Sequence, residues 1–305
     1  MNKEVKGILI SLLGAVAVSN VYIFSKAALQ EIHLAQFGFY WFGLGIIWNL
    51  LYSLKGRKIK TIRSLKPKTA WVLIAIGLLE VGGTTLFFTS IQIVENPAIV
   101  SFLANFNPFF ITFLGIVILK EKFGKYEIAG IIFTLAGAFL ISFKGNTDMS
   151  KFLVQGTEYV FASALLFGLA AIIAKKNIMT VDPVILSISR SVFLFTFSFI
   201  MLCIYCKSFM IPSSAALNIV IGSLLGPFLT VFASYLSLKY IGAGKASIVR
   251  SSRSFFVLLG AYLYFDTLPY DYQIMGGILT IAGVILISLG NMFRNRKLQK
   301  TRVNS

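Results

Sequence analysis

The sequence is poor in charge, in acids and in histidine. Only 13% of its 305 residues are Asp, Glu, Lys or Arg, against about 25% in soluble domains. A single histidine, His33, leaves no partner for a histidine-based metal site, so we expect no metal. The eleven acids are scattered and form no D-D-x-x-D-like group, and we therefore predict that the chain is not an enzyme acting on lipid substrates.

Cysteine and nucleotide-binding signals are also scarce. Cys203 and Cys206 form a C-x-x-C inside the apolar stretch "IMLCIYCKSF". A redox motif would need a βαβ setting and a zinc site would need further ligands, so we interpret both as small apolar side chains of a helix. No G-x4-G-K-[ST] is present, and we expect no cofactor and no ATP-driven step.

Long hydrophobic runs make up most of the sequence. The chain is 57% hydrophobic and its mean hydropathy is +0.84, and a membrane-spanning helix needs about 20 mostly apolar residues. We therefore predict an all-α polytopic membrane protein surrounded by the lipid bilayer, whose first apolar stretch is not a cleaved signal. The ten predicted transmembrane helices are 6–29, 34–54, 69–91, 98–119, 126–143, 155–174, 183–206, 213–238, 246–265 and 271–293.

The net charge is +17, and the basic residues are distributed as in a membrane protein. The basic residues concentrate in 55–68 and 294–302, beside apolar runs, which is typical of cytoplasmic loops near anionic headgroups and does not indicate a nucleic-acid partner. With a cytoplasmic N-terminus, the inner segments carry 21 of the 28 Lys and Arg, the outer segments carry 3, and 4 lie within helices. Both termini are therefore predicted in the cytoplasm, in a cytoplasmic (inner or plasma) membrane.

The sequence repeats itself. "GIIFTLAGAFLIS" (130–142) matches "GGILTIAGVILIS" (276–288) at an offset of 146. "NPFFITFLGIVILKEK" (107–122) pairs with "RSFFVLLGAYLYFDT" (253–267) in the same way. Because each repeat holds five helices, the second copy enters the membrane from the opposite side, as in secondary transporters. We predict two inverted halves, 1–145 and 152–293, followed by a basic cytoplasmic tail, 294–305.

These motifs resemble a known family. Ten helices, the segment from Pro108 to Glu121 and the G-x6-G that follows are similar to the drug/metabolite transporter superfamily, EamA type, over nearly the whole chain. Ser254 and Asp266 depart from the pattern in the second half. The resemblance implies a central cavity lined mainly by the third, fourth, eighth and ninth helices, with the first, second, sixth and seventh as moving walls. The fifth and tenth helices would be peripheral or at a dimer contact, which leaves monomer and homodimer open.

Four charged residues stand out inside predicted helices. Arg190, Arg250, Arg253 and Glu80 lie at membrane depth, where a charge costs about 2.5–3.5 kcal/mol on insertion scales. In a continuous helix over 246–265, Arg250 and Arg253 share one face with serines, because they are three residues apart. Such a stripe faces protein or water and not lipid.

Two interpretations of these charges remain open. In the first, Glu80 pairs with one arginine, Arg190 caps helix ends and Arg250 extends to the inner headgroups. In the second, three arginines against one glutamate leave surplus positive charge that attracts a carboxylate or phosphate. The second predicts a secondary transporter of an anionic or zwitterionic metabolite, such as an amino acid or organic acid, working by alternating access in either direction. The first allows an efflux transporter of neutral or cationic compounds. Glu80 could be a proton carrier or a structural partner.

Uncharged candidates complete the predicted substrate site. Prolines and glycines that interrupt helices at this depth suit hinges, although packing kinks explain them equally well. The glycine spacings of 130 to 137 and 276 to 283 favour close helix packing. The predicted substrate-contacting residues are Arg250, Arg253, Arg190, Glu80, Asn105, Asn107, Asn20, Tyr22, Trp41 and Tyr235, and the predicted hinge residues are Pro108, Gly226 and Pro227.

Overall fold

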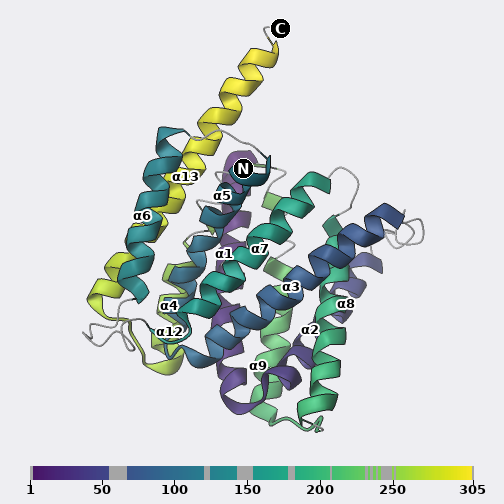
Figure 1. Ribbon diagram of the computed structural model, residues 1–305. Coiled ribbons are helices and arrows are strands. Elements are labelled where there is room, and N and C mark those ends of the chain that lie inside the picture. The colour runs from purple at the N-terminus through teal and green to yellow at the C-terminus, as the bar shows by residue number, and fades with distance from the viewer. Residues whose placement is uncertain are drawn as a thin grey trace.

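The structure is a computed structural model and is entirely helical in the part of the chain that it describes (Figure 1). That part comprises residues 3–54, 67–119, 124–142, 154–177, 183–206, 208–230, 233, 236–237, 240–241, 249–250 and 252–303. The α-helices are α1 (Lys3–Glu31), α2 (Leu34–Leu54), α3 (Pro67–Ile93), α4 (Pro97–Leu103), α5 (Asn107–Leu119), α6 (Lys125–Ser142), α7 (Thr157–Asn177), α8 (Pro183–Met201), α9 (Ser213–Ser223), α12 (Arg253–Phe265) and α13 (Asp271–Val303). A 3-10 segment, η2 (Ala104–Phe106), and two π-helical segments, η4 (Leu202–Cys206) and η5 (Leu224–Thr230), extend some of them.

The helices match a polytopic membrane protein. Within the described ranges, seven helical stretches are long and apolar enough to cross a membrane. Three shorter apolar helices, in α6, α12 and the first half of α13, accompany them. These elements correspond in order to the ten predicted helices, and the predicted all-α membrane fold is confirmed.

The fourth predicted helix is not continuous. The sequence predicts one helix over 98–119, whereas the structure divides it into α4, η2 and α5. Pro108 has no N–H to donate to the carbonyl of Ala104, four residues earlier. The backbone N–H of Asn107 donates a hydrogen bond to the Ala104 carbonyl instead, which closes a tighter 3-10 turn. The break therefore lies one residue before the proline.

The eighth predicted helix changes to a wider π-helical segment at Pro227. α9 ends at Ser223, and η5 follows as a π-helical segment that contains Pro227. Because Pro227 lacks an N–H for the carbonyl four residues back, the backbone departs from α-helical bonding there. The helix interruption that the sequence predicts at Gly226 and Pro227 is present.

Two boundaries differ from the prediction. The ninth helix is predicted as continuous over 246–265, but Ser252 lies in a turn between helical residues 249–250 and α12, which begins at Arg253. α13 extends to Val303, so most of the segment predicted as a basic tail is helical. The first correction matters for the site, because Arg250 and Arg253 do not share an uninterrupted helix face.

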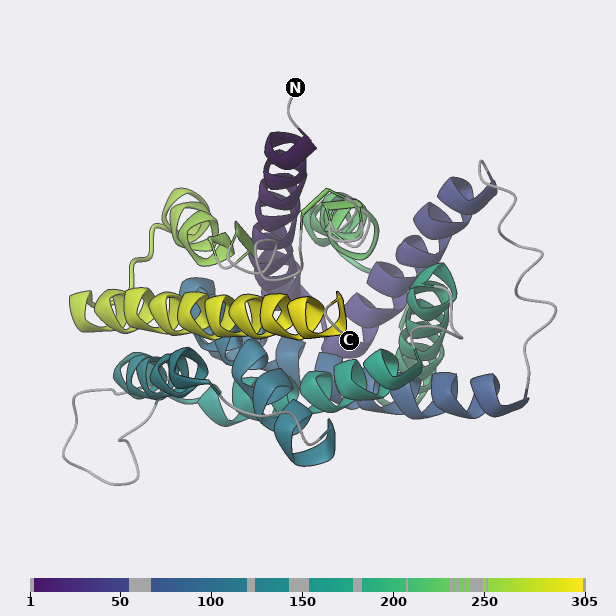
Figure 2. The same ribbon diagram turned by 90° about the horizontal axis from the view of Figure 1, so that it is seen from above.

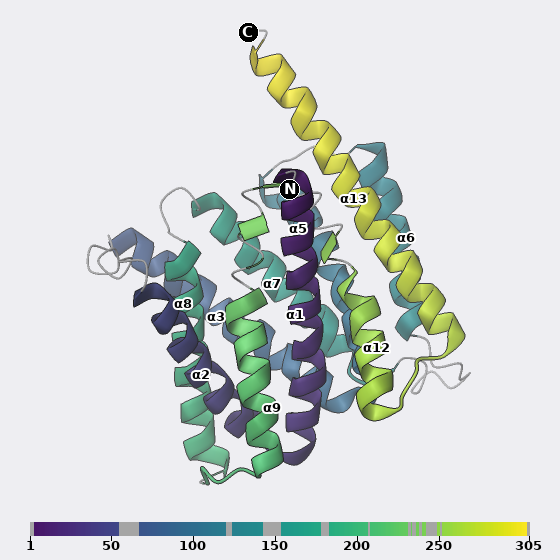
Figure 3. The same ribbon diagram turned by 180° about the vertical axis from the view of Figure 1, so that it is seen from behind.

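α1 lies on one face of the bundle, between two helices of the second half. Figure 3 shows α1 between α9 and α12, and it packs against both. The N- and C-termini lie at the same end of the bundle, as an even number of crossings requires (Figure 1). α6 and α13 run side by side at one edge, which the view from above also shows (Figure 2). The fifth and tenth helices are therefore peripheral to the bundle.

The α6–α13 contact is built from the two glycine pairs. A Cβ added at Gly130 would lie 2.6 Å from the carbonyl oxygen of Gly283, and one at Gly276 would lie 2.7 Å from that of Gly137. Neither distance is tolerable, so only glycine allows the backbones to approach this closely. Because 130 and 276, like 137 and 283, are related by the repeat offset, the contact is reciprocal between the two halves.

Candidate functional site

A central cavity of about 210 Å³ lies between the helices. The sequence predicts lining mainly from the third, fourth, eighth and ninth helices, but the first, second, sixth and seventh contribute as well. The lining residues are Val18, Val21, Tyr22, Trp41, Phe42, Thr84, Phe87, Phe88, Ala104, Asn107, Ser163, Ala164, Phe167, Arg190, Gly226, Pro227, Thr230 and Arg253. Aromatic and aliphatic side chains form most of this surface, with a few polar groups among them.

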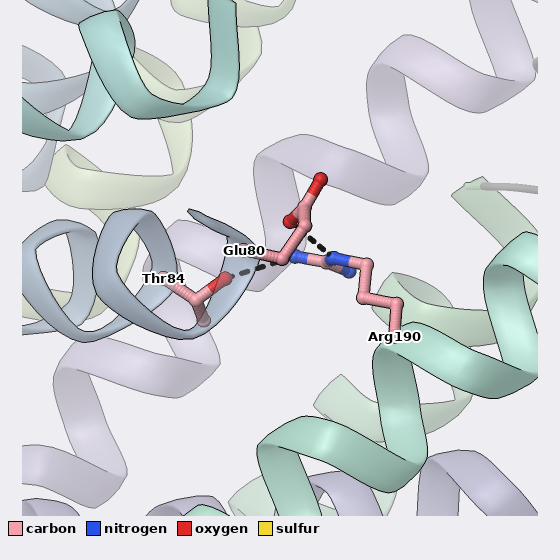
Figure 4. Close-up of polar contacts among 3 residues, drawn as sticks. All are labelled: Glu80, Thr84 and Arg190. Carbon is pink, nitrogen blue, oxygen red and sulfur yellow. Dashed lines mark hydrogen bonds and ion pairs between the residues drawn. The ribbon is translucent and has the colours of Figure 1, made fainter. Parts of the chain in front are cut away.

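One arginine of the cavity is paired with an acid. Arg190 Nε of α8 lies 2.6 Å from Glu80 Oε2 of α3, and the Arg190 Nη2 group donates to Thr84 Oγ1 at 3.2 Å (Figure 4). The Arg190 and Glu80 side chains are 33% and 18% exposed. Arg190 lines the cavity, whereas Glu80 does not. Glu80 neutralises the charge of Arg190 from outside the lining. The pair also ties the third helix of the first half to the seventh helix.

The other lining arginine contacts a neutral network. Arg253 Nη2 lies 3.4 Å from Asn105 Oδ1, a long hydrogen bond. Asn105 Nδ2 in turn donates to Ser254 Oγ at 2.9 Å, and Ser254 Oγ donates to the Ser101 carbonyl at 3.2 Å. The network joins α12 to α4 and η2. Within the part of the chain that the structure describes, no acid lies within ion-pair distance of Arg253.

Two polar atoms at the cavity are buried without a hydrogen-bond partner among the described residues. They are Arg253 Nε, a donor, and Asn107 Oδ1, an acceptor. Leaving such a group unpaired costs about 1–3 kcal/mol. Asn107 and Arg253 are also separated by 146 residues, so equivalent positions of the two repeats present complementary groups to one cavity.

Comparison with known proteins decides the family. The sequence profile of the EamA-like transporter family matches residues 5–143 and 155–289. The chain belongs to the EamA-like transporter family. The predicted membership of the drug/metabolite transporter superfamily is thereby confirmed, and the chain is an integral membrane transporter.

Relatives of this EamA-like transporter point the same way. It is 22% identical over 254 residues to the uncharacterized transporter YyaM of Bacillus subtilis (strain 168), covering 81% of this chain and 82% of that protein. A crystal structure of another protein superimposes with a TM-score of 0.67 at 15% identity, covering 95% of this chain and 99% of the other. At that identity the second match shows a shared fold.

The cavity of the EamA-like transporter includes several of the residues predicted from sequence. Tyr22 and Trp41 line it and are 2% and 1% exposed. Gly226 and Pro227 line it from η5. Pro108 is the second residue of α5, directly after the lining residue Asn107.

Other predicted site residues lie elsewhere. Asn20 donates to the Val16 carbonyl of its own helix at 2.8 Å and is not among the residues that line the central cavity. Arg250 precedes the turn at Ser252 and does not line the cavity either. Asn105 lies behind the surface, where it supports Arg253. Tyr235 falls outside the described residues.

Sequence reasoning missed the hydroxyl groups. Thr84 and Thr230 both line the cavity and are separated by 146 residues, so the repeat offset could have identified them as a pair. Ser163 gave no comparable signal.

A lysine near the far end of α1 was also missed. Lys26 is 4% exposed, and its ammonium group donates to the carbonyls of Gln92 at 3.0 Å and Val94 at 2.7 Å, at the C-terminal end of α3. A cation suits the negative end of a helix dipole. The sequence signal for Lys26 was its charge within a predicted membrane helix. In the structure, Lys26 holds α1 against the end of α3.

Proposed function

We propose that this EamA-like transporter is a secondary transporter that moves a small anionic or zwitterionic metabolite across the cytoplasmic membrane by alternating access, with both termini in the cytoplasm. The observation that carries the proposal is Arg253. It lines the central cavity with no acid in reach among the described residues, and its Nε–H group is buried without an acceptor.

The charge balance of the cavity supports an anionic group on the solute. Glu80 compensates Arg190, whereas Arg253 contacts the neutral amide of Asn105. Among the described residues, one surplus guanidinium, that of Arg253, therefore faces the cavity, whereas the sequence alone suggests two. In a site of low dielectric, a guanidinium binds carboxylate or phosphate through a charge-assisted fork of hydrogen bonds.

The other unpaired atom favours a solute that also carries a donor. Asn107 Oδ1 can accept a hydrogen bond from an ammonium or amide group. The walls around it include Tyr22, Trp41 and Phe167, which suit an apolar body. The volume is below the roughly 300–1,000 Å³ of pockets for drug-sized ligands. A zwitterionic amino acid meets these conditions together.

Two polar links cross between the halves, which supports alternating access. Arg190 with Glu80 joins α8 to α3, and Arg253 with Asn105 joins α12 to η2. A rocking of one half against the other changes both links at the walls of the cavity. The non-α-helical backbone at η2 and η5 lies in the same region and gives the helices places to bend.

The test is ligand-dependent thermal stability of the purified protein, followed by uptake into proteoliposomes. Amino acids, organic acids, phosphorylated metabolites and organic cations are compared. A ligand that binds only the folded state stabilises it by about 2.7 kcal/mol at a hundredfold excess over Kd. Zwitterions or anions should raise the melting temperature of the wild type and of Arg250→Gln, a matched control off the cavity. Folded Arg253→Gln should lose that shift.

A different result would favour the alternative function. Aromatic walls can also bind cations through their ring faces. If cationic or neutral compounds stabilise the protein, and Arg253→Gln keeps that response, the arginines are structural and the protein is an efflux transporter of such compounds.

A further inference from the structure

A second cavity lies next to the central one, toward the end of the bundle opposite the termini. Its volume is about 150 Å³, and α2, α3, α8 and η4 contribute its walls. The residues His33 and Tyr205 are exposed at its mouth, where their rings stack with centroids 6.5 Å apart. We call this space, bounded by His33 and Tyr205 at one end and by Phe42 and Phe88 at the other, the outer cavity.

The two cavities share a wall. Phe42, Thr84 and Phe88 line both of them and are only 4%, 2% and 5% exposed. Side chains, with no intervening helix, therefore separate a space that opens at the outer end from the space that contains Arg253. We call these three residues the partition.

We propose that the outer cavity is a transit site through which the solute passes between the outer face and the central cavity, and that the partition is the gate between them. This inference rests on the proposed function, because it assigns a route to the same solute. It places that route between α2, α3 and α8, to one side of the contacts that join α12 to α4.

The partition is made of groups that can move without unfolding a helix. The rings of Phe42 and Phe88 meet edge to face with centroids 6.3 Å apart. Rotation of one of these rings into another rotamer would join the cavities without unfolding a helix. Thr84 accepts a hydrogen bond from Arg190, so the partition is connected to the charged group of the central cavity.

α8, which lines the outer cavity, packs closely against α2 and changes helix type at its end. α8 ends in the π-helical segment η4, and such segments occur frequently at functional sites. Gly38 of α2 lies directly against Ser198 of α8, and a Cβ at Gly43 would lie 3.1 Å from the ring of Phe195. At these two positions glycine lets α8 pack closely against α2, so the two helices form a common wall of the outer cavity.

The lining of the outer cavity indicates what it accommodates. Apart from His33 and Tyr205 at the mouth, its lining contains no ionisable side chain, and its other polar side chains are the hydroxyls of Thr84, Thr85 and Ser198 in a mainly aromatic and aliphatic surface. Charged groups are costly to desolvate in such a surface unless they are hydrogen-bonded, and the lining hydroxyls can bond those of a small solute while the apolar surface contacts its body. The outer cavity therefore takes the same zwitterionic class as the central site.

The experiment measures the accessibility of engineered cysteines in intact cells. Cys203 and Cys206 are first replaced by serine, and Ser198→Cys is then introduced in the outer cavity. A small, charged, membrane-impermeant thiol reagent is added outside. Ser198→Cys should react faster than Ile200→Cys on the exposed side of α8, because only the former lines the outer cavity.

The gate is tested with a cysteine in the central cavity. Ser163→Cys should react slowly from outside in the otherwise native protein and faster when Phe88→Ala opens the partition. Phe102→Ala is the matched control, since Phe102 is 0% exposed and lines neither cavity. Phe42→Leu and Phe88→Leu provide milder openings should an alanine variant fail to fold.

The outcomes separate this inference from the proposed function. An unreactive Ser198→Cys, reaction from the cytoplasmic side alone, or an equal response of Ser163→Cys to the Phe88 and Phe102 variants overturns the route. Because labelling needs no solute, these results do not depend on which metabolite is transported. Protection of Ser198→Cys by the solute found in the stability assay would connect the two.

Discussion

The α6–α13 interface and the central cavity use the same repeat relation in opposite ways. At the interface, positions 146 residues apart carry the same residue: Gly130 and Gly276 match, as do Thr134 and Thr280. At the cavity, Thr84 matches Thr230, but the charged positions differ: Asn107 corresponds to Arg253, and Glu80, which lies beside the cavity, corresponds to Gly226. The interface is closed and both its threonines are 0% exposed, whereas the cavity keeps space and unpartnered polar atoms.

The difference separates stability from function within one fold. Identical small residues at equivalent positions give a reciprocal, tightly packed contact, which is how membrane helices associate when lipid is as apolar as their side chains. Unlike residues at equivalent positions give a site that distinguishes one end of a solute from the other. The buried Asn107 oxygen and Arg253 Nε lower stability unless a ligand binds them.

The largest effect is expected at the interface. Gly137→Leu should prevent accumulation of folded protein, because even a Cβ at Gly137 would lie 2.5 Å from the Gly276 carbonyl oxygen and backbone atoms have nowhere to move. Overpacking typically costs about 1–3 kcal/mol, and more when backbones must separate. Size-exclusion chromatography of the detergent-extracted protein measures the loss. Ala136→Leu, on the exposed side of the same helix, is the control and should behave as wild type.

The next effect tests the ion pair at the cavity. Glu80→Gln leaves the Arg190 guanidinium uncompensated and should lower the melting temperature, by less than the roughly 3–5 kcal/mol of a fully buried pair because both side chains are partly exposed. Adding Arg190→Gln should recover part of the loss, since the unpaired charge is then removed. A double variant no more stable than Glu80→Gln would show that the pair is not the source of the effect.

Two neighbouring asparagines should respond in opposite directions. Asn105→Leu breaks its hydrogen bonds with Ser254 and Arg253 and should destabilise the protein by about 1–3 kcal/mol. Asn107→Leu removes an unpartnered oxygen and should leave the melting temperature unchanged or higher, while abolishing the ligand-induced shift. Thermal melts with and without solute measure both. Equal destabilisation by the two substitutions would contradict a ligand role for Asn107.

The smallest effect belongs to the interface threonines. Thr134 and Thr280 each donate to a glycine carbonyl of their own helix at 2.7 Å, and side-chain hydrogen bonds in membranes average about 0.6 kcal/mol. Thr134→Val and Thr280→Val keep the volume and should change stability by similar small amounts. A large difference between the two melting temperatures would show that the contact is less reciprocal than its geometry indicates.

Much of the fold followed from the sequence, for a physical reason. In lipid every backbone polar group must be satisfied internally, so long apolar runs have to become helices, and their number and order could be predicted. The spacing of the glycine pairs predicts close helix packing, because only small residues let two helix backbones approach each other. The interruptions at Pro108 and Pro227 followed from the missing N–H of proline.

The contents of the cavity were harder to predict because they depend on helix rotation and on where each helix begins. A turn at Ser252 separates Arg250 from Arg253, and only the latter reaches the cavity. Asn20 bonds within its own helix instead of lining the site. The sequence by itself determined the family, the ten helices and the presence of charge at membrane depth, because lipid constrains each helix separately. The tertiary structure alone decided that Glu80 neutralises Arg190 and that no acid among the described residues pairs with Arg253, because that choice depends on distances between helices that no single helix encodes.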